Sequence, residues 1–197
     1  MNDIFSVKNK IIVITGAGRG IGRFLANELS KRSAIVYAVD KTFSKKNQTN
    51  DYFQKKCDIT NKIQFQKVCK NILKNNRKID VLINNAGVTL PNNSSKDYPL
   101  DDWKKTIDVN LTGVFVCSQI VAKIMKKRRT GSIINITSIN AELGFPNNPA
   151  YVASKGGLKM LTKSLARDFG KYNIRVNNLG PGYIITDMTK NSYQNKK

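Results

Sequence analysis

The sequence has 197 residues and a formal net charge of +21, from 34 Lys and Arg against 13 Asp and Glu, and it contains no histidine. The positive charge favours anionic partners, but the lysines are spread over the whole sequence without a nucleic-acid-binding motif, so we expect no specific nucleic-acid binding. The absence of histidine excludes imidazole as a general base, and we expect no metal site.

The N-terminal part reads as a strand, a helix and a second strand. A β-branched apolar run at 11–15 ends in a glycine-rich turn, which predicts a buried strand. Residues 21–31 carry apolar side chains at helical spacing, and a second apolar run at 34–39 leads to Asp40. This order predicts a parallel βαβ unit.

The middle of the sequence continues the alternation. We expect a short strand at 52–57, a lysine-rich helix at 61–76 and a buried strand at 79–83. The polar segments 41–51 and 88–100 are expected to be loops.

The C-terminal part repeats the pattern twice. A long helix at 102–127 precedes a strand at 132–137, and the helix that carries Tyr151 precedes a strand at 174–179. Strands therefore alternate with helices throughout residues 1–197. This predicts a single α/β domain with a Rossmann-like, doubly wound parallel sheet in a three-layer α/β/α arrangement.

The sequence also bears on cellular location. No apolar run approaches the roughly 20 residues that cross a bilayer, so we expect no membrane association. The first residues do not resemble a secretory signal, and the three cysteines lack metal-type spacing. We therefore expect free thiols and a cytoplasmic protein.

A glycine-rich turn, TGAGRGIG at 15–22, follows the first strand and opens the first helix. Glycines let the backbone approach a pyrophosphate, and the helix N-terminus offers free amide groups. Asp40 ends the second strand, where a carboxylate accepts hydrogen bonds from ribose hydroxyls and repels a 2′-phosphate. We therefore favour NAD(H) over NADP(H), although Arg19 and Lys41 offer charges that suit a 2′-phosphate.

A second pattern is YVASK at 151–155. Residues four apart share one face of a helix, so the Tyr151 phenol and the Lys155 ammonium are expected side by side. A neighbouring positive charge favours the phenolate and should lower the pKa of Tyr151, which would then exchange a proton with a substrate oxygen.

With these and further motifs the sequence resembles the short-chain dehydrogenase/reductase family, along essentially its whole length. The matching segments are TGAGRGIG at 15–22, CDIT at 57–60, NNAG at 84–87, DVNLTG at 108–113, INITS at 134–138, YVASK at 151–155 and NNLGPGYIITDMT at 177–189. The resemblance implies reversible hydride transfer between a nicotinamide cofactor and an alcohol or carbonyl group of a small molecule.

The resemblance also implies roles for individual residues. Tyr151 would be the general acid/base, and Lys155 would lower its pKa and hold the nicotinamide ribose. Ser138 would bind the substrate oxygen, and Asn110 would anchor a water in a proton relay. The remaining implied cofactor contacts are Gly16, Arg19, Gly20, Ile21, Gly22, Asp40, Asp58, Ile59, Asn84, Ala86, Gly87, Pro181, Gly182, Ile184 and Thr186. For Asn84, a bridge between strands is an equal alternative.

The sequence departs from the family pattern at its end. It stops soon after Thr186, so we expect a sheet without the last strand and a site without the substrate-covering lid. A truncated, weakly active or inactive dinucleotide-binding protein is therefore the alternative to an enzyme. Within the enzyme interpretation, the sequence is similar to β-ketoacyl-carrier-protein reductases, which makes acyl carrier protein an alternative partner. This carrier protein would dock on Arg128, Arg129 and Lys171. The other interpretation of these three residues is that they are solvated cations without a partner. The long helix 102–127 and the helix that carries Tyr151 are expected to pair two copies into a homodimer or homotetramer.

Overall fold

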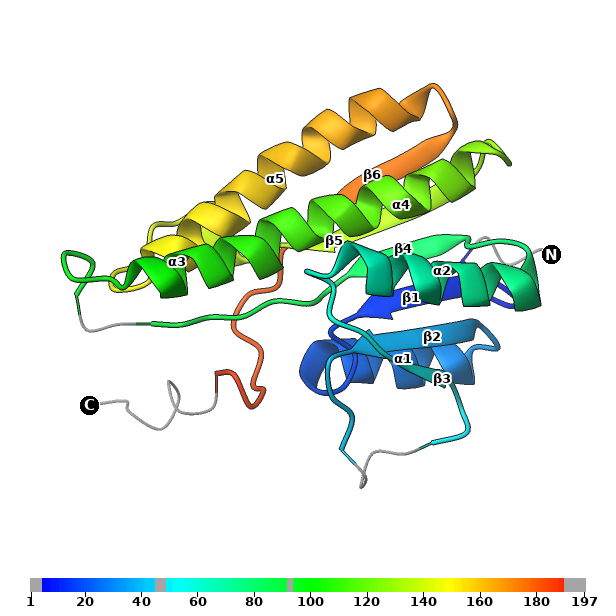
Figure 1. The fold of residues 1–197 in the computed structure, drawn as a ribbon, viewed down its shortest axis with the longest axis horizontal. Coiled ribbons are helices and arrows are strands. Elements are labelled where there is room, and N and C mark those ends of the chain that lie inside the picture. The colour runs from blue at the N-terminus through cyan, green and yellow to red at the C-terminus, as the bar shows by residue number, and fades with distance from the viewer. Residues whose placement is uncertain (1–4, 45–48, 92–93, 190–197) are drawn as a thin grey trace.

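Six parallel strands form one sheet in the computed structural model, which describes residues 5–44, 49–91 and 94–189 (Figure 1). Their order across the sheet is β3-β2-β1-β4-β5-β6. The strands are β1 (Ile11–Thr15), β2 (Ile35–Asp40), β3 (Phe53–Lys56), β4 (Val81–Asn84), β5 (Gly131–Ile136) and β6 (Ile174–Leu179). This order is that of the doubly wound dinucleotide-binding fold and confirms the predicted fold class.

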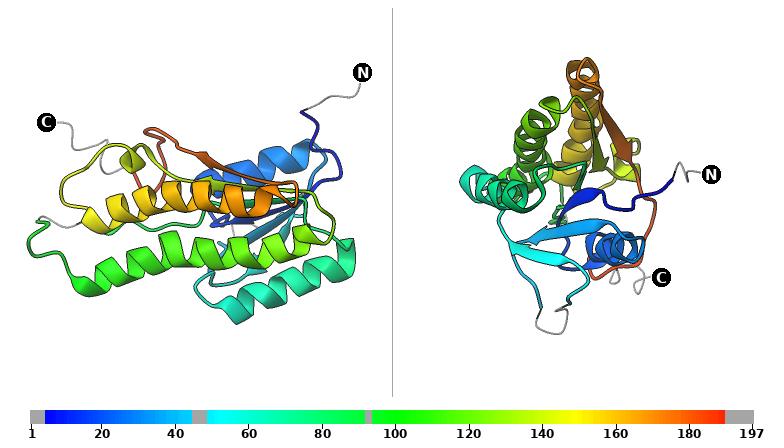
Figure 2. Two further views of the ribbon diagram at one scale, coloured as in Figure 1. Left: turned by 90° about the horizontal axis from the view of Figure 1, so that it is seen from above. Right: turned by 90° about the vertical axis from the view of Figure 1, so that its right-hand side faces the viewer.

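The helices cover the two faces of the sheet unequally. They are α1 (Gly20–Lys31), α2 (Lys62–Asn76), α3 (Leu100–Ile107), α4 (Val114–Lys126) and α5 (Pro149–Gly170), with the short segments η2 (Asp108–Gly113) and η3 (Ile139–Ala141). The connection through α1 runs toward β3, and those through α2, α4 and α5 run toward β6. Because crossovers are right-handed, these two directions place helices on opposite faces, and the end-on view in Figure 2 shows α1 apart from the other three.

The predicted elements agree with the structure, with one difference in detail. The predicted helix 102–127 begins at Leu100 and is interrupted by η2, a π-helical segment at Asp108–Gly113. The predicted loops 41–51 and 88–100 contain no helix or strand where they are described, apart from Leu100, and each lies partly outside the described residues. Between β6 and Thr189 the described chain forms no further strand.

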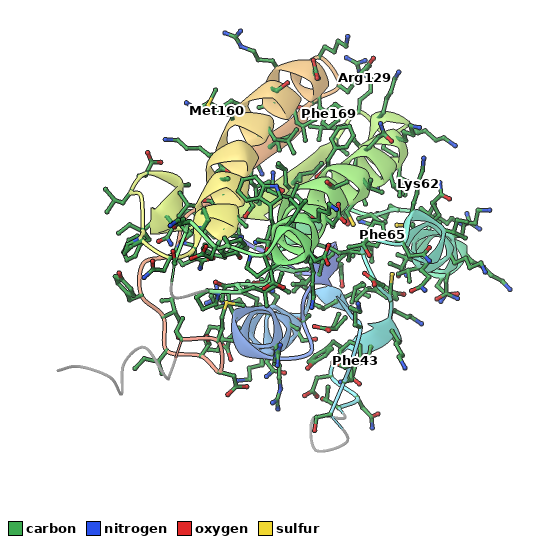
Figure 3. The ribbon with its side chains drawn as sticks, turned by 60° about the vertical axis from the view of Figure 1, so that its left-hand side comes forward. Phe43, Lys62, Phe65, Arg129, Met160 and Phe169 are labelled. Carbon is green, nitrogen blue, oxygen red and sulfur yellow. The ribbon has the colours of Figure 1, made fainter. Side chains whose placement is uncertain are left out.

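The larger core lies between the sheet and α2, α4 and α5. It contains apolar residues from alternate positions of the strands together with the inner faces of these helices. In α2, Phe65 is fully buried whereas Lys62 is exposed (Figure 3). The buried residues of α2 recur at helical spacing along one face, namely Phe65, Val68, Cys69 and Ile72, so the helix is amphipathic.

The segment Leu100–Lys126 is long and apolar enough to cross a membrane by length and mean hydropathy alone. In the fold, however, Cys117, Val121 and Met125 on α4 are at most 1% exposed and belong to the core cluster. The hydropathy of this segment is thus accounted for by its packing as a core helix.

Candidate active site

The predicted site residues gather at the carboxyl ends of the strands. The glycine-rich turn follows β1, Asp40 ends β2, Asp58 follows β3, Gly87 follows β4 and Ser138 follows β5. In open parallel sheets this edge, beside the point where the strand order reverses, is where ligands bind.

The four predicted catalytic residues converge at one point. The Ser138 side chain is near enough to the Tyr151 phenol to act on its pKa, and the Lys155 Nζ lies 5.5 Å from the centre of the Tyr151 ring. A Cβ atom placed on Gly87 would lie 3.4 Å from Asn110 Oδ1 and 3.7 Å from Lys155 Nζ. Three elements thus supply the set: the end of β5, the π-helical segment η2 and the first two turns of α5.

Asn110 is fully buried, and its side chain is used entirely within the protein. Its Oδ1 accepts from the Val88 amide at 2.8 Å, and its Nδ2 donates to the Val88 carbonyl at 2.9 Å and to Ser154 Oγ at 3.1 Å. These contacts use both hydrogens of the amide group, so the side chain could only accept a further hydrogen bond, at Oδ1. Asn110 lies in a π-helical segment, and such segments occur often at functional sites.

Lys155 is 4% exposed, and its Nζ donates to the Ile136 carbonyl at 2.8 Å. Burial disfavours the ammonium and lowers the pKa of Lys155 to about 8. Lys155 therefore changes charge near pH 8, within the pH range in which enzymes work.

The expectation that the pKa of Tyr151 is lowered is wrong in direction. Burial of the phenol raises its pKa, and the Ser138 side chain opposes this shift without reversing it. At neutral pH the protein on its own therefore holds Tyr151 protonated, as an acid ready to donate. The spacing of Tyr151 and Lys155 predicted their contact but not the desolvation of both groups.

The glycine-rich turn has the shape of a phosphate cradle. A Cβ on Gly16 would lie 2.6 Å from the Ala86 Cα, and a Cβ on Gly18 would lie 2.3 Å from the Thr42 carbonyl oxygen, so neither position has room for a side chain. The N-cap residue of α1, Arg19, makes no side-chain capping bond, which leaves the first amides of the helix available to an anion. These residues fit the pyrophosphate of a dinucleotide.

The structure brings part of the segment after β6 to this turn. A Cβ on Gly20 would lie 3.7 Å from Thr186 Cγ2, and Thr189 holds the Thr186 backbone by accepting from its amide at 2.9 Å. Ile184 is 47% exposed, and Pro181 accepts a bond at its carbonyl from the Ile139 amide. Pro181 therefore lies beside the segment that follows Ser138, Thr186 lies beside the glycine-rich turn, and the predicted residues Gly182 and Ile184 lie on the stretch between them.

Two predicted cofactor residues have side chains that serve the core instead. Asn84 is 1% exposed and donates to Ser118 Oγ at 2.9 Å and to Asn135 Oδ1 at 2.8 Å, which supports the alternative of a bridge between β4 and β5. Ile59, expected to pack on the adenine, is 5% exposed and packs against Gly113. Little of its side chain is left for a ligand.

Sequence reasoning missed two residues that hold the turn in place. The Asn85 Nδ2 donates to the Gly16 carbonyl at 2.8 Å, and Thr15 Oγ1 accepts from the amides of Asn85 and Ala86, both at 3.1 Å. These bonds connect the end of β1 to the end of β4. Both residues lie inside motifs quoted above, so the motifs were the available signal, but only the fold shows that they contact each other.

A sequence model of the family described as short chain dehydrogenase matches residues 10–197. The chain belongs to this family. As a short-chain dehydrogenase it is an oxidoreductase that uses NAD(P), and its relatives act on alcohol or carbonyl groups.

Curated relatives of this short-chain dehydrogenase include two kinds of reductase. It is 37% identical to 5-keto-D-gluconate 5-reductase of Escherichia coli K12 over 198 residues, which cover 96% of this chain and 78% of the relative. It is 35% identical to a 3-oxoacyl-[acyl-carrier-protein] reductase of Synechocystis over 191 residues, covering 92% and 77%.

Solved structures give the same fold. A gluconate 5-dehydrogenase from Burkholderia cenocepacia, in complex with NADP and tartrate, matches with a TM-score of 0.90 and 31% identity, covering 98% of this chain and 78% of that one. An NAD⁺-bound xylitol dehydrogenase matches with a TM-score of 0.84 and 30% identity, covering 90% and 71%.

Proposed function

We propose that this short-chain dehydrogenase interconverts a secondary alcohol and a ketone of a small polyol or sugar acid, with Tyr151 as general acid/base. The observation that carries the proposal is the convergence of Ser138, Tyr151, Lys155 and Asn110 beside Gly87. The four side chains stand at the strand edge that also holds the glycine-rich turn.

The chemistry divides between the cofactor and the chain. When bound, the nicotinamide supplies the redox step, by accepting a hydride from the alcohol carbon or returning it to the carbonyl carbon. Tyr151 takes the hydroxyl proton in oxidation and returns it to the oxygen in reduction. Ser138 donates a hydrogen bond to that oxygen, and the Lys155 ammonium stabilises the phenolate and holds the nicotinamide ribose.

We also propose that the cofactor is NAD(H) in preference to NADP(H). Asp40 ends β2 beside the glycine-rich turn, and its Oδ2 accepts from the Gly18 amide at 2.8 Å. A carboxylate fixed there is suited to ribose hydroxyls and would repel a 2′-phosphate. Related structures hold NADP in one case and NAD⁺ in another, so kinship does not decide this point.

The polyol proposal is favoured over a carrier-bound substrate by the location of the cationic residues. Arg128 is 3.5 Å from Asp80, and Arg129 donates to the Lys171 carbonyl at 2.9 Å. This cluster lies past the far end of α5 from Tyr151, about 30 Å along the helix. Within one subunit it therefore does not border the catalytic residues. A 3-oxoacyl-carrier-protein reductase is the second candidate, supported by the Synechocystis relative.

We further propose that two copies pair through α4 and α5 as a homodimer, which a second interface would extend to a tetramer. Phe115 on α4 and Met160 on α5 are 38% and 59% exposed. A groove lies between α4 and the end of α5, lined by Gln119, Ala122, Lys123, Lys126, Phe169 and Tyr172. Light scattering that returns only a monomer would contradict the pairing.

We propose a cytoplasmic location as well, because the fully buried free thiol of Cys117 fits a reducing environment.

The proposed activity is tested by loss of NADH absorbance with a panel of keto sugar acids, small ketones and a 3-oxoacyl thioester. We expect turnover with keto acids, and Tyr151→Phe should lower kcat at least about 100-fold. Tyr172→Phe, at the other end of α5, is the matched control and should retain the wild-type rate. Cofactor binding without turnover on any substrate would instead support a dinucleotide-binding protein without catalytic function.

A further inference from the structure

An ion pair spans the ends of β2 and β3, beside the residue proposed to read the cofactor ribose. The Lys41 Nζ lies 2.8 Å from Asp58 Oδ2. Lys41 directly follows Asp40, and the Asp40 carbonyl accepts from the Cys57 amide at 2.8 Å, which places Asp58 one residue beyond the contact between the two strands. The adjacent strands β2 and β3 are seen in Figure 1. The Lys41 ammonium is thus paired with Asp58, while its backbone adjoins Asp40 in the sequence.

The Asp58 carboxylate is held in place by hydrogen bonds from Thr60. Its Oδ1 accepts from the Thr60 amide at 2.9 Å and from Thr60 Oγ1 at 2.8 Å, while Oδ2 is left to Lys41. Burial alone would raise the pKa of Asp58, but Lys41 and the Thr60 bonds outweigh it, so the pKa lies below its usual value and the group is charged at neutral pH.

Asp40 is fixed independently of Lys41. Its Oδ2 accepts from the Gly18 amide at 2.8 Å and its Oδ1 from the Thr42 amide at 3.2 Å. The lack of space for a Cβ on Gly18 shows how tightly the turn packs on this carboxylate. Among the described residues the Asp40 carboxylate forms no ion pair, so its negative charge is not cancelled there as that of Asp58 is.

We propose that Asp58 sets the cofactor preference indirectly, by holding Lys41 away from the ribose 2′ position. This inference rests on the proposed function. With Lys41 paired, the two charges cancel, and the uncancelled Asp40 disfavours a 2′-phosphate. A released ammonium beside Asp40 would offset that carboxylate and contact a phosphate directly.

The interaction free energy of the Lys41–Asp58 pair is small because the pair is exposed. The Lys41 side chain is 68% exposed and that of Asp58 is 26% exposed. Ion pairs of this kind are weak, and release of Lys41 should change the ratio of the two cofactor affinities by about two- to fivefold. The change should shrink in high salt, where exposed charges are screened.

The test measures Kd for NADH and NADPH by fluorescence titration, which needs no turnover. Asp58→Asn keeps the acceptor for Thr60 and removes the charge, and we expect NADPH binding to improve relative to NADH by the stated factor. The double variant Asp58→Asn/Lys41→Met removes both charges and should return the ratio to the wild-type value. Glu28→Gln, which frees Lys31 from an exposed pair on α1, adds the same net charge and should leave the ratio unchanged.

Three results would overturn the inference: an unchanged ratio in Asp58→Asn, a gain that persists in the double variant, or an equal gain in Glu28→Gln. If Asp58→Asn fails to fold by circular dichroism, Asp58→Ser removes the same charge and carries the same expectations. Absence of binding of either cofactor to the wild-type chain would overturn the proposed function together with this inference. An unchanged ratio overturns the inference alone.

Discussion

The Asn110 amide donates a hydrogen bond to Ser154 Oγ at 3.1 Å, and that hydroxyl donates in turn to the Tyr151 carbonyl at 2.7 Å. Ser154 is fully buried. The π-helical segment is thereby connected to the turn of α5 that carries Tyr151, the proposed general acid/base. Asn110 also binds both backbone groups of Val88, so one pair of side chains positions three segments of the site.

Removal of this connection should affect turnover more than stability alone would explain. Ser154→Ala leaves a buried amide hydrogen of Asn110 without an acceptor, which costs about 1–3 kcal/mol of unfolding free energy. Because the reacting groups tolerate little displacement, we expect kcat to fall about tenfold or more while KM changes little. Steady-state kinetics and urea unfolding measure the two effects.

The matched control for this change is Ser118→Ala. Ser118 is also fully buried and accepts from Asn84, but it lies on α4 beneath the sheet. We expect a similar loss of stability with an unchanged kcat. An equal fall of kcat in both variants would show that Ser154 acts on folding and not on the position of Tyr151.

The buried Lys155 should make stability depend on pH. Its pKa is about 8 in the folded chain against an ordinary 10.5, so the unfolded chain binds the proton more tightly. Burial of the ammonium therefore opposes folding fully below pH 8, and this opposition fades as the pH rises toward 10.5. The wild-type free energy of unfolding, minus that of Lys155→Met, should increase by about 2–3 kcal/mol between pH 7 and pH 10.

Urea unfolding of both proteins at the two pH values gives this difference, in which the other titrating groups cancel. A difference that stays constant with pH would mean that Lys155 is charged equally easily in both states.

Local patterns sufficed to predict the fold, because buried strands are continuous in sequence, and motifs such as YVASK sufficed to select four residues that the fold brings together. They did not suffice where contacts join distant segments. A π-helical turn has no propensity signal, so neither η2 nor the resulting use of the Asn110 side chain was foreseen. Burial of Tyr151 reversed the expected direction of its pKa shift. The pairing of Lys41 with Asp58 depends on the adjacency of β2 and β3, which no motif encodes.

The glycine-rich turn offers a steric test of cofactor binding. A Cβ on Gly18 would lie 2.3 Å from the Thr42 carbonyl oxygen and 3.0 Å from the Asp40 carboxylate, so Gly18→Ala must displace the turn from Asp40. We expect NADH affinity to fall at least about tenfold in fluorescence titration. Gly156→Ala on α5 meets no atom within 4 Å and should leave NADH affinity unchanged, with stability raised by about 0.5–1 kcal/mol. Equal NADH affinity in Gly18→Ala would show that the turn does not hold the cofactor.

Asp80, just before β4, binds the first residue of β1 and should make the stability of the fold sensitive to acid. Its Oδ2 accepts from the Ile11 amide at 2.8 Å and lies 2.7 Å from Lys78 Nζ. Burial alone would raise the pKa of Asp80, but Lys78, the Ile11 amide and Arg128 outweigh it and hold the pKa below its usual value. A carboxyl group with a depressed folded pKa stabilises the fold above its unfolded pKa, and this contribution is lost as pH falls through the folded pKa.

Asp80→Asn should therefore lower the unfolding free energy by about 1–3 kcal/mol at pH 7, because a charge-assisted bond becomes a neutral one. Asp101→Asn is the matched control, since the Asp101 side chain is 98% exposed and its contact with Lys104 is 3.9 Å long. Urea unfolding at pH 7 and at pH values below the unfolded pKa of Asp should show the Asp80→Asn deficit shrinking as the wild-type carboxylate takes up its proton. A deficit of the same size at both ends of this range would mean that the amide disturbs packing, and that the charge of Asp80 does not stabilise the sheet edge.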